Sequence, residues 1–333
     1  MTVWEWAQLV LGLGLVLLAA EALVRGASEL AAALGIPPLV IGLTVVAFGT
    51  SSPELAVSVA AAFRGNGDIT FGNVAGSNLF NIAVVLGAAA LIRPVEVPMA
   101  IRRQVRWIEA PLMLGAALAA GAVAWDGRIS RWEGLVLVLA LILYILWQVR
   151  EARAGQQTLP APVLEPPRKP SEAVQAAGRR RGALLRDGLL VLGGLGGLYL
   201  GSEWMVDGAV ALARWAGVPD RVIALTLIAG GTSLPEVATS VVSAIRRQPE
   251  IALGNVLGSN LFNVAAVLGL SALVSPADLP VSPDSRIVDL PVLAGLSTLA
   301  FLILAMRPRV SRLHGALLLV LYGGYVAFLV ARP

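Results

Sequence analysis

Apolar residues with few charges fill ten stretches of the chain, and each stretch is close to the length of a membrane-spanning helix. A helix that crosses a bilayer takes about 20 predominantly apolar residues. The candidate helices cover residues 4–23, 37–63, 69–92, 105–124, 132–149, 184–212, 219–245, 251–274, 287–306 and 312–331. The pattern therefore predicts an all-α membrane protein with ten transmembrane helices.

The stretch from Arg150 to Arg186 interrupts this pattern. It contains the basic run Arg179–Arg181 and a set of prolines, namely Pro160, Pro162, Pro166, Pro167 and Pro170. Such a composition is typical of a solvated linker that has no core of its own. We therefore divide the chain into a first unit (1–150), a basic, proline-rich linker (151–183) and a second unit (184–333).

The two units repeat each other in sequence. Residues 21–98 align with residues 203–280 without a gap, and a weaker match joins Ser130-Arg131 to Ser311-Arg312. Each unit contains five predicted helices, an odd number, so the second unit enters the membrane from the opposite side. The sequence therefore predicts two inverted five-helix repeats, an arrangement typical of secondary transporters that work by alternating access.

Composition agrees with a polytopic membrane protein. Only 14% of the 333 residues are charged, against about 25% in soluble domains, and the mean hydropathy is +0.79. Most basic residues fall on the linker side of the predicted helices. The exceptions are Arg64, Arg128, Arg131, Arg214, Arg221, Arg286 and Arg332. Because basic loops stay inside, we expect a multi-pass protein of the cell (inner) membrane with a cytoplasmic linker and both termini outside. The arginines set topology, so we expect no nucleic-acid partner.

One polar motif stands inside the second helix of each unit. Gly49-Thr50-Ser51-Ser52-Pro53-Glu54 recurs as Gly231-Thr232-Ser233-Leu234-Pro235-Glu236. A charge at bilayer depth costs several kcal/mol, so an intramembrane carboxylate indicates a functional site. Because the carboxylate recurs in matching positions, the two motifs predict one site built from both units.

The residues of this motif share one helical face. Ala47, Thr50, Ser51 and Glu54 are spaced i, i+3, i+4 and i+7, and Ala229, Thr232, Ser233 and Glu236 repeat the spacing. The proline in each motif removes a helical hydrogen bond, and the freed backbone carbonyls are tolerated in a membrane only where they line a cavity or are buried in protein.

The third helix of each unit carries a second repeated motif. It reads Gly72-Asn73-Val-Ala-Gly-Ser77-Asn78-Leu-Phe-Asn81 in the first unit and Gly254-Asn255-Val-Leu-Gly-Ser259-Asn260-Leu-Phe-Asn263 in the second. Ser77 and Asn81 are four residues apart, as are Ser259 and Asn263. We expect their oxygens to face the helices that carry the glutamates, so the candidate metal ligands include Ser77, Asn81, Ser259 and Asn263.

These residue types favour hard cations. Oxygen ligands suit Ca²⁺ and Na⁺, whereas softer metals prefer imidazole or thiolate. The chain has no Cys and one His, which excludes disulfides and both thiolate and polyhistidine metal sites. Two carboxylates match one divalent or two monovalent cations. We expect no cofactor, and the expected partners are the transported ions and the lipid bilayer; no oligomeric state is predicted.

The paired motifs GTSSPE…GNVAGSNLFN and GTSLPE…GNVLGSNLFN resemble the alpha repeats of the sodium/calcium exchanger family, of prokaryotic type, within the cation/calcium antiporter superfamily. The resemblance covers essentially the whole chain. It implies that Glu54 and Glu236 hold Ca²⁺ at the bilayer midplane. It also implies that the Thr and Ser hydroxyls contribute oxygens to Na⁺ or Ca²⁺ sites, and the carbonyls of Ala47 and Ala229 are expected Na⁺ ligands.

The implied function is export of Ca²⁺ in exchange for Na⁺, with the first and sixth helices as the moving pair. One position departs from the family, because several exchangers have Asp where this chain has Asn263. An H⁺-coupled or K⁺-dependent exchanger of Ca²⁺ or another divalent cation is therefore the alternative, and a passive cation channel is a further one. We do not expect an enzyme, since a carboxylate pair is the only candidate for catalysis in the membrane.

Several other charged residues lie near predicted helix ends. They are Glu21, Arg25, Glu109, Glu203, Asp207 and Asp289. Charged side chains at such positions usually reach the membrane–water interface, and we interpret all six as interfacial.

Overall fold

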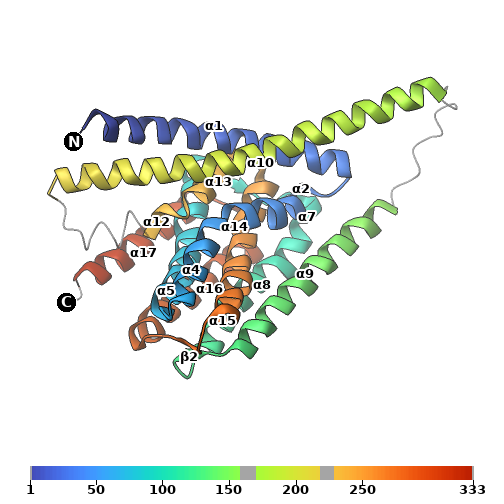
Figure 1. The fold of residues 1–333 in the computed structure, drawn as a ribbon. Helices are drawn as coiled ribbons and strands as arrows, with labels where there is room; N and C mark the ends of the chain where they lie inside the picture. Colours follow the sequence, from blue (N-terminus) through green and yellow to red (C-terminus); the bar gives the residue numbers. More distant parts are fainter. Residues whose placement is uncertain (1, 158–169, 218–228, 332–333) are drawn as a thin grey trace.

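The computed structural model describes residues 2–157, 170–217 and 229–331, which are almost entirely helical (Figure 1). The first half contains α1 (Val3–Leu34), α2 (Pro38–Ile41), η1 (Gly42–Val46), α3 (Ala47–Thr50), α4 (Ser52–Phe63), α5 (Gly67–Phe80), η2 (Asn81–Val85), α6 (Leu86–Ile92), β1 (Val95–Glu96), α7 (Met99–Gln104), η3 (Val105–Glu109), α8 (Ala110–Val123), β2 (Arg128–Ile129) and α9 (Arg131–Gln157). The segments labelled η are π-helical.

The described second half follows the same order. It contains α10 (Pro170–Trp215), α12 (Ala229–Gly231), α13 (Leu234–Ile245), α14 (Pro249–Phe262), η5 (Asn263–Leu268), α15 (Gly269–Val274), β3 (Leu279–Pro280), η6 (Ser285–Asp289), α16 (Leu290–Met306), β4 (Arg309–Val310) and α17 (Arg312–Ala331). Of the predicted helix 219–245, residues 219–228 lie outside the described part.

Among the described residues, seven helices are long and apolar enough to cross a membrane. The number becomes eight if Pro38–Thr50 and Ser52–Phe63, which are bent by 47° at their junction, count as one span. The prediction of an all-α membrane protein is therefore confirmed.

Several helices extend beyond their predicted ends. α1 continues past residue 23 to Leu34 and ends at Gly35, whose φ of 66° stops the helix. α9 continues to Gln157 and α10 begins at Pro170, so both enter the stretch expected to be linker. A helix satisfies its backbone hydrogen bonds internally, and it can therefore continue where the apolar pattern has ended.

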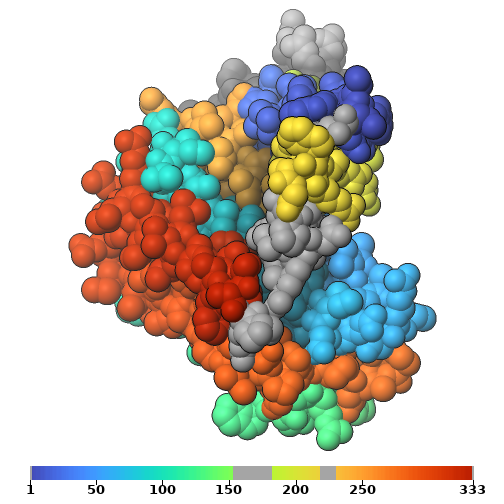
Figure 2. All heavy atoms as spheres, turned by 90° about the vertical axis from the view of Figure 1, so that its left-hand side faces the viewer, coloured from blue at the N-terminus to red at the C-terminus, as the bar shows by residue number. Residues whose placement is uncertain are grey.

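α1 and α10 lie side by side and run in opposite directions across one face of the molecule (Figures 1 and 2). Glycines bring the two backbones close together. A Cβ atom at Gly194 would lie 2.7 Å from the backbone nitrogen of Leu23, and one at Gly208 would lie 2.7 Å from that of Leu9. Small residues at such crossings allow tight packing of membrane helices.

The two polar motifs lie where helices break. Ser51, with φ and ψ of −83° and 6°, separates α3 from α4, and Ser233, with −93° and 10°, precedes α13. A proline stands in the first turn of each following helix. Because proline has no N–H, it cannot continue the hydrogen-bond ladder of the preceding turn, so each break follows from its sequence.

α14 passes close to the first half at the middle of the bundle. A Cβ at Gly254 would lie 2.7 Å from the carbonyl oxygen of Leu39, and one at Gly258 would lie 2.6 Å from the Cβ of Ala47. α5 and α14 each continue into a π-helical segment, which begins at Asn81 in η2 and at Asn263 in η5. Such π segments inside helices are frequent at functional sites.

Two short antiparallel strand pairs join the halves. β1 pairs with β4, with Val95 opposite Val310, and β2 pairs with β3, with Ile129 opposite Leu279. In both pairs one strand comes from each half, so backbone hydrogen bonds link the two halves.

Candidate cation-binding site

The two intramembrane glutamates are completely buried. Glu54 and Glu236 are each 0% exposed, and each lies in the first turn of its helix, α4 or α13. The N-terminus of a helix carries a partial positive charge, which stabilises a nearby anion. The helix breaks therefore place both carboxylates where the backbone favours negative charge.

Serines connect the two carboxylates crosswise. Ser51 Oγ of the first half donates to Glu236 Oε1 of the second at 3.1 Å, and Ser233 Oγ donates to Glu54 Oε1 at 2.8 Å. Each carboxylate is thus held by a hydroxyl from the other half. The two motifs meet at one place and form a single polar site.

An asparagine supports the backbone of each glutamate. Asn73 Nδ2 donates to the carbonyl of Glu54 at 3.2 Å and to Ser58 Oγ at 2.8 Å. The second half repeats this contact, because Asn255 Nδ2 donates to the carbonyl of Glu236 at 3.2 Å and to a serine, Ser240, at 2.9 Å. Sequence reasoning did not include these two serines, although they occupy equivalent positions of the repeat.

The two threonines of the motifs differ in their contacts. Thr50 is 1% exposed, and its hydroxyl donates to Asn255 Oδ1 at 3.0 Å. Thr232 is half-buried, and its hydroxyl has no hydrogen-bond partner. The repeated motifs therefore have different surroundings on the two sides of the site.

Several buried polar atoms of the predicted site have no hydrogen-bond partner. They are Glu54 Oε2, Glu236 Oε2, Ser77 Oγ, Ser259 Oγ, Asn81 Oδ1 and Nδ2, Asn263 Oδ1 and Thr232 Oγ1. Buried polar groups in folded proteins are almost always paired with protein or water. A concentration of unpaired oxygens beside two carboxylates is the arrangement expected where a cation binds.

The two predicted asparagine ligands are not equivalent. Asn263 Nδ2 donates to Asn78 Oδ1 at 3.1 Å, and Asn78 Nδ2 donates in turn to the carbonyl of Asn260 at 3.2 Å. The Asn263 amide is thereby oriented, and its oxygen is left without a partner. Neither polar atom of the Asn81 side chain has a partner.

The sequence predicts the backbone carbonyls of Ala47 and Ala229 as ligands, and the structure describes the contacts of Ala47 only. Ala47 is buried, and its carbonyl oxygen accepts from the backbone N–H of Ser51 at 3.0 Å and from the hydroxyl of Thr50 at 3.4 Å. Ala229 is the first residue of α12, and its contacts lie outside the described part of the chain. Because the single Thr50 proton is shared with the closer Asn255 Oδ1, the Ala47 carbonyl has one full hydrogen bond, from Ser51, before any ion is considered.

The atoms that could coordinate a cation at this site are oxygens. Among the described residues, no three or more His, Cys, Asp or Glu side chains gather as a metal cluster. Two carboxylates combined with hydroxyl and amide oxygens suit the hard cations Ca²⁺ and Na⁺ rather than softer metals.

A second buried carboxylate lies away from this site. Glu109 is 2% exposed and accepts hydrogen bonds from Gln104 at 2.8 Å, Gln148 at 2.7 Å and Tyr144 at 2.5 Å. Our interpretation of Glu109 as an interfacial residue is therefore wrong, since three neutral donors satisfy it inside the protein. Asp289, at the end of η6, is half-buried and accepts from a tyrosine of α17.

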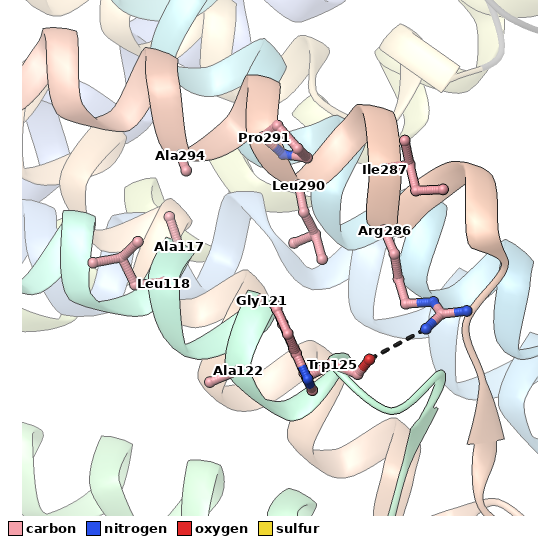
Figure 3. A pocket seen from close by; sticks show the side chains of 10 residues that line it. All are labelled: Ala117, Leu118, Gly121, Ala122, Trp125, Arg286, Ile287, Leu290, Pro291 and Ala294. Carbon is pink, nitrogen blue, oxygen red and sulfur yellow. Dashed lines mark hydrogen bonds between the residues drawn. The ribbon is translucent and has the colours of Figure 1, made fainter.

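A surface pocket is also separate from the glutamates. It has a volume of about 830 Å³ and lies between α8 and the helix formed by η6 and α16 (Figure 3). Its lining is mostly apolar, with Arg286 at one end donating to the carbonyl of Trp125 at 3.2 Å. It contains none of the predicted site residues.

Comparison with known proteins agrees with the fold and the motifs. The sodium/calcium exchanger protein family matches residues 4–150 and 188–331. The chain is 37% identical to the inner membrane protein YrbG of Escherichia coli (97% of this chain, 95% of the relative) and 32% identical to the sodium/calcium exchanger MaX1 of Methanosarcina acetivorans (97% of each).

A solved structure agrees as well. One structure of the sodium-calcium exchanger NCX_Mj superposes with a TM-score of 0.78 at 29% identity and covers 100% of both chains. MaX1 and NCX_Mj are both named as sodium/calcium exchangers. The chain is therefore a multi-pass membrane protein and a cation antiporter of the sodium/calcium exchanger family.

Proposed function

We propose that this protein exports Ca²⁺ in exchange for Na⁺ by alternating access at a midplane site shared by Glu54 and Glu236. The observation that carries the proposal is the set of buried oxygens without partners around two carboxylates that serines hold crosswise. One Ca²⁺ or two Na⁺ would balance the two negative charges. Bound Ca²⁺ and Na⁺ would use overlapping oxygens, so the two ions would exclude each other.

The proposed ligands are those predicted from the sequence. They are Glu54 and Glu236 with Thr50, Ser51, Thr232, Ser233, Ser77, Ser259, Asn81, Asn263 and the carbonyls of Ala47 and Ala229. Burial of Ser77 and Ser259 beside unpaired oxygens supports a role in binding. The Ala47 carbonyl would bind the ion with its second lone pair, because the backbone N–H of Ser51 already donates to it.

We further propose the ten-helix arrangement of two inverted repeats, 1–150 and 184–333, with a cytoplasmic linker and both termini outside. Equivalent contacts in the halves support it: the crosswise serines, the π-helical segments that begin at Asn81 and Asn263, and the strand pairs that each take one strand from either half. In alternating access, the two repeats would then exchange their conformations around the shared site.

α1 and α10 are the proposed moving pair. Their packing on each other through Gly194 and Gly208 supports their movement as one body. Glycine contacts present a smooth surface, and neither helix carries residues of the two ion-binding motifs.

The test is ⁴⁵Ca²⁺ uptake into proteoliposomes under an imposed Na⁺, H⁺ or K⁺ gradient. Uptake driven by Na⁺, and reduced to the level of protein-free liposomes by Glu54→Gln and by Glu236→Gln, is the expected result. Each substitution keeps the shape of the side chain and removes one charge. Glu151→Gln, at an exposed position of α9, is the matched control and should retain uptake.

Three other results of this uptake experiment would lead to different conclusions. Uptake driven by protons or by K⁺ alone would replace Na⁺ as the coupling ion while retaining the site. Flux that needs no counter-ion gradient would identify a passive channel. Na⁺-driven uptake that survives the loss of both glutamates would refute the proposed site.

A further inference from the structure

A small cavity lies beside the paired glutamates, between α4, α10 and the turn after α12. Its volume is about 230 Å³. Pro53 and Thr232 line it from the two polar motifs, and Tyr199, Ser202, Glu203 and Asp207 line it from α10. Pro53 precedes Glu54, and Thr232 precedes the serine that donates to Glu54. The cavity therefore borders the proposed ion site.

Two hydroxyl groups in this cavity have no hydrogen-bond partner. Ser202 is 6% exposed, and neither its Oγ nor Thr232 Oγ1 makes a hydrogen bond. Because buried hydroxyls are normally paired, two unpaired hydroxyls on opposite walls indicate that the cavity holds polar contents.

Two carboxylates stand at the α10 wall of the same cavity. Glu203 and Asp207 are one helical turn apart and both are exposed. Glu203 accepts a hydrogen bond from Tyr199 at 2.8 Å, and among the described residues neither carboxylate forms a salt bridge. Carboxylates inside an apolar helix normally face protein or a water-filled cavity. This position explains both residues better than the interfacial role expected from the sequence.

The equivalent positions of the first repeat have a different balance of charge. Glu203 corresponds to Glu21, which forms a bidentate salt bridge with Arg246, and Asp207 corresponds to Arg25. Val24 of α1 is 0% exposed, and the equivalent threonine, Thr50, is buried and hydrogen-bonded. The first repeat therefore has a paired carboxylate and an arginine at these positions, whereas the second repeat has two carboxylates beside the cavity.

We propose that Glu203, Asp207 and Ser202 form a recruiting site for a hydrated divalent cation, which passes from there to Glu54 and Glu236. This inference rests on the proposed exchange function. Two adjacent carboxylates that form no salt bridge with a described residue raise the local concentration of Ca²⁺, because a cleft lined with one sign of charge concentrates the opposite ion. Ser202 and Thr232, whose hydroxyls have no partner, line the cavity between these carboxylates and the paired glutamates.

The test is the Ca²⁺ concentration dependence of Na⁺-driven exchange in the double variant Glu203→Gln/Asp207→Asn. The KM for Ca²⁺ is expected to rise about three- to tenfold at low ionic strength, as loss of electrostatic attraction predicts, with kcat unchanged. The difference should shrink as choline chloride is added, because salt screens exposed charges. In vesicles of defined orientation, the effect should be confined to Ca²⁺ supplied from the side of the cavity.

Controls separate this role from a general charge or folding effect. Asp68→Asn removes an exposed carboxylate at the start of α5, outside the cavity, and should leave the KM unchanged. Glu203→Asp keeps the charge and should retain most of the affinity. If the double variant does not fold, the single variant Asp207→Asn should show a smaller rise in KM with the same salt dependence.

If the parent protein shows normal Na⁺-driven exchange, two results would overturn the inference. One is an unchanged KM in the variants. The other is a salt-independent loss of kcat, which would assign the carboxylates to conformational change instead. A parent protein that shows no Na⁺-driven exchange would overturn the proposed function, and this inference with it.

Discussion

Asn255 makes the largest set of hydrogen bonds in the shell around the glutamates. Its Nδ2 donates to the carbonyl of Glu236 at 3.2 Å and to Ser240 Oγ at 2.9 Å, and its Oδ1 accepts from Thr50 at 3.0 Å. The residue is 0% exposed. Asn255→Ala therefore removes three contacts at once and leaves each partner buried.

The destabilisation caused by Asn255→Ala follows from the number of hydrogen bonds that it removes. One hydrogen bond contributes about 1 kcal/mol net, and a buried partner left unpaired costs about 1–3 kcal/mol. Three lost bonds therefore predict a destabilisation of at least about 3 kcal/mol. The equivalent substitution Asn73→Ala removes two bonds at a half-buried position, where water replaces part of the loss, and should cost about 2 kcal/mol or less.

Thermal unfolding in detergent measures the difference. At about 2 °C per kcal/mol for a chain of this size, Tm should fall by about 6 °C in Asn255→Ala and by about 4 °C or less in Asn73→Ala. Tryptophan fluorescence can follow unfolding, and ⁴⁵Ca²⁺ exchange by the folded fraction reports on the site. Equal shifts in the two variants, or a smaller shift for Asn255→Ala, would refute the reasoning, because the Thr50 contact and the full burial would then contribute nothing.

Two further predictions concern packing and the second buried carboxylate. In Gly258→Leu, the new side chain collides with Ala47, since even a Cβ atom would lie 2.6 Å from the Ala47 Cβ. This overpacking costs about 1–3 kcal/mol or more and should lower the yield of folded protein in size-exclusion chromatography. An unchanged yield would contradict the close helix crossing. Tyr144→Phe leaves Glu109 Oε2 without its donor and should lower stability by about 1–3 kcal/mol while Na⁺-driven exchange continues. Loss of exchange by stable Tyr144→Phe protein would show that this cluster belongs to the transport machinery.

The repeated motifs contained most of the information about the site. An intramembrane carboxylate that recurs at an equivalent position predicts a shared polar centre, and the structure buries Glu54 and Glu236 together with the serines of the opposite motif. The crosswise direction of those hydrogen bonds could not be read from the sequence, because it depends on how the two broken helices face each other. The hydrogen bonds from Asn73 and Asn255 to the glutamate carbonyls could not be read from the sequence for the same reason.

Charged residues near helix ends were the least predictable. Apolar periodicity indicates where a span ends, but it does not show which polar side chains another helix supplies. Glu109 was interpreted as interfacial because its donors Tyr144 and Gln148 lie on a different helix, far along the chain. Glu21 likewise has its partner, Arg246, in the other half.

The two strand pairs bear on how the chain is made. β1 can pair with β4 only after Arg309 and Val310 have been synthesised, and β2 can pair with β3 only after Leu279 and Pro280 have been synthesised. Until then, the strand backbone of the newly inserted first half has no partner strand at either loop. A chain that ended before β4 would therefore leave the backbone groups of β1 without their partner strand.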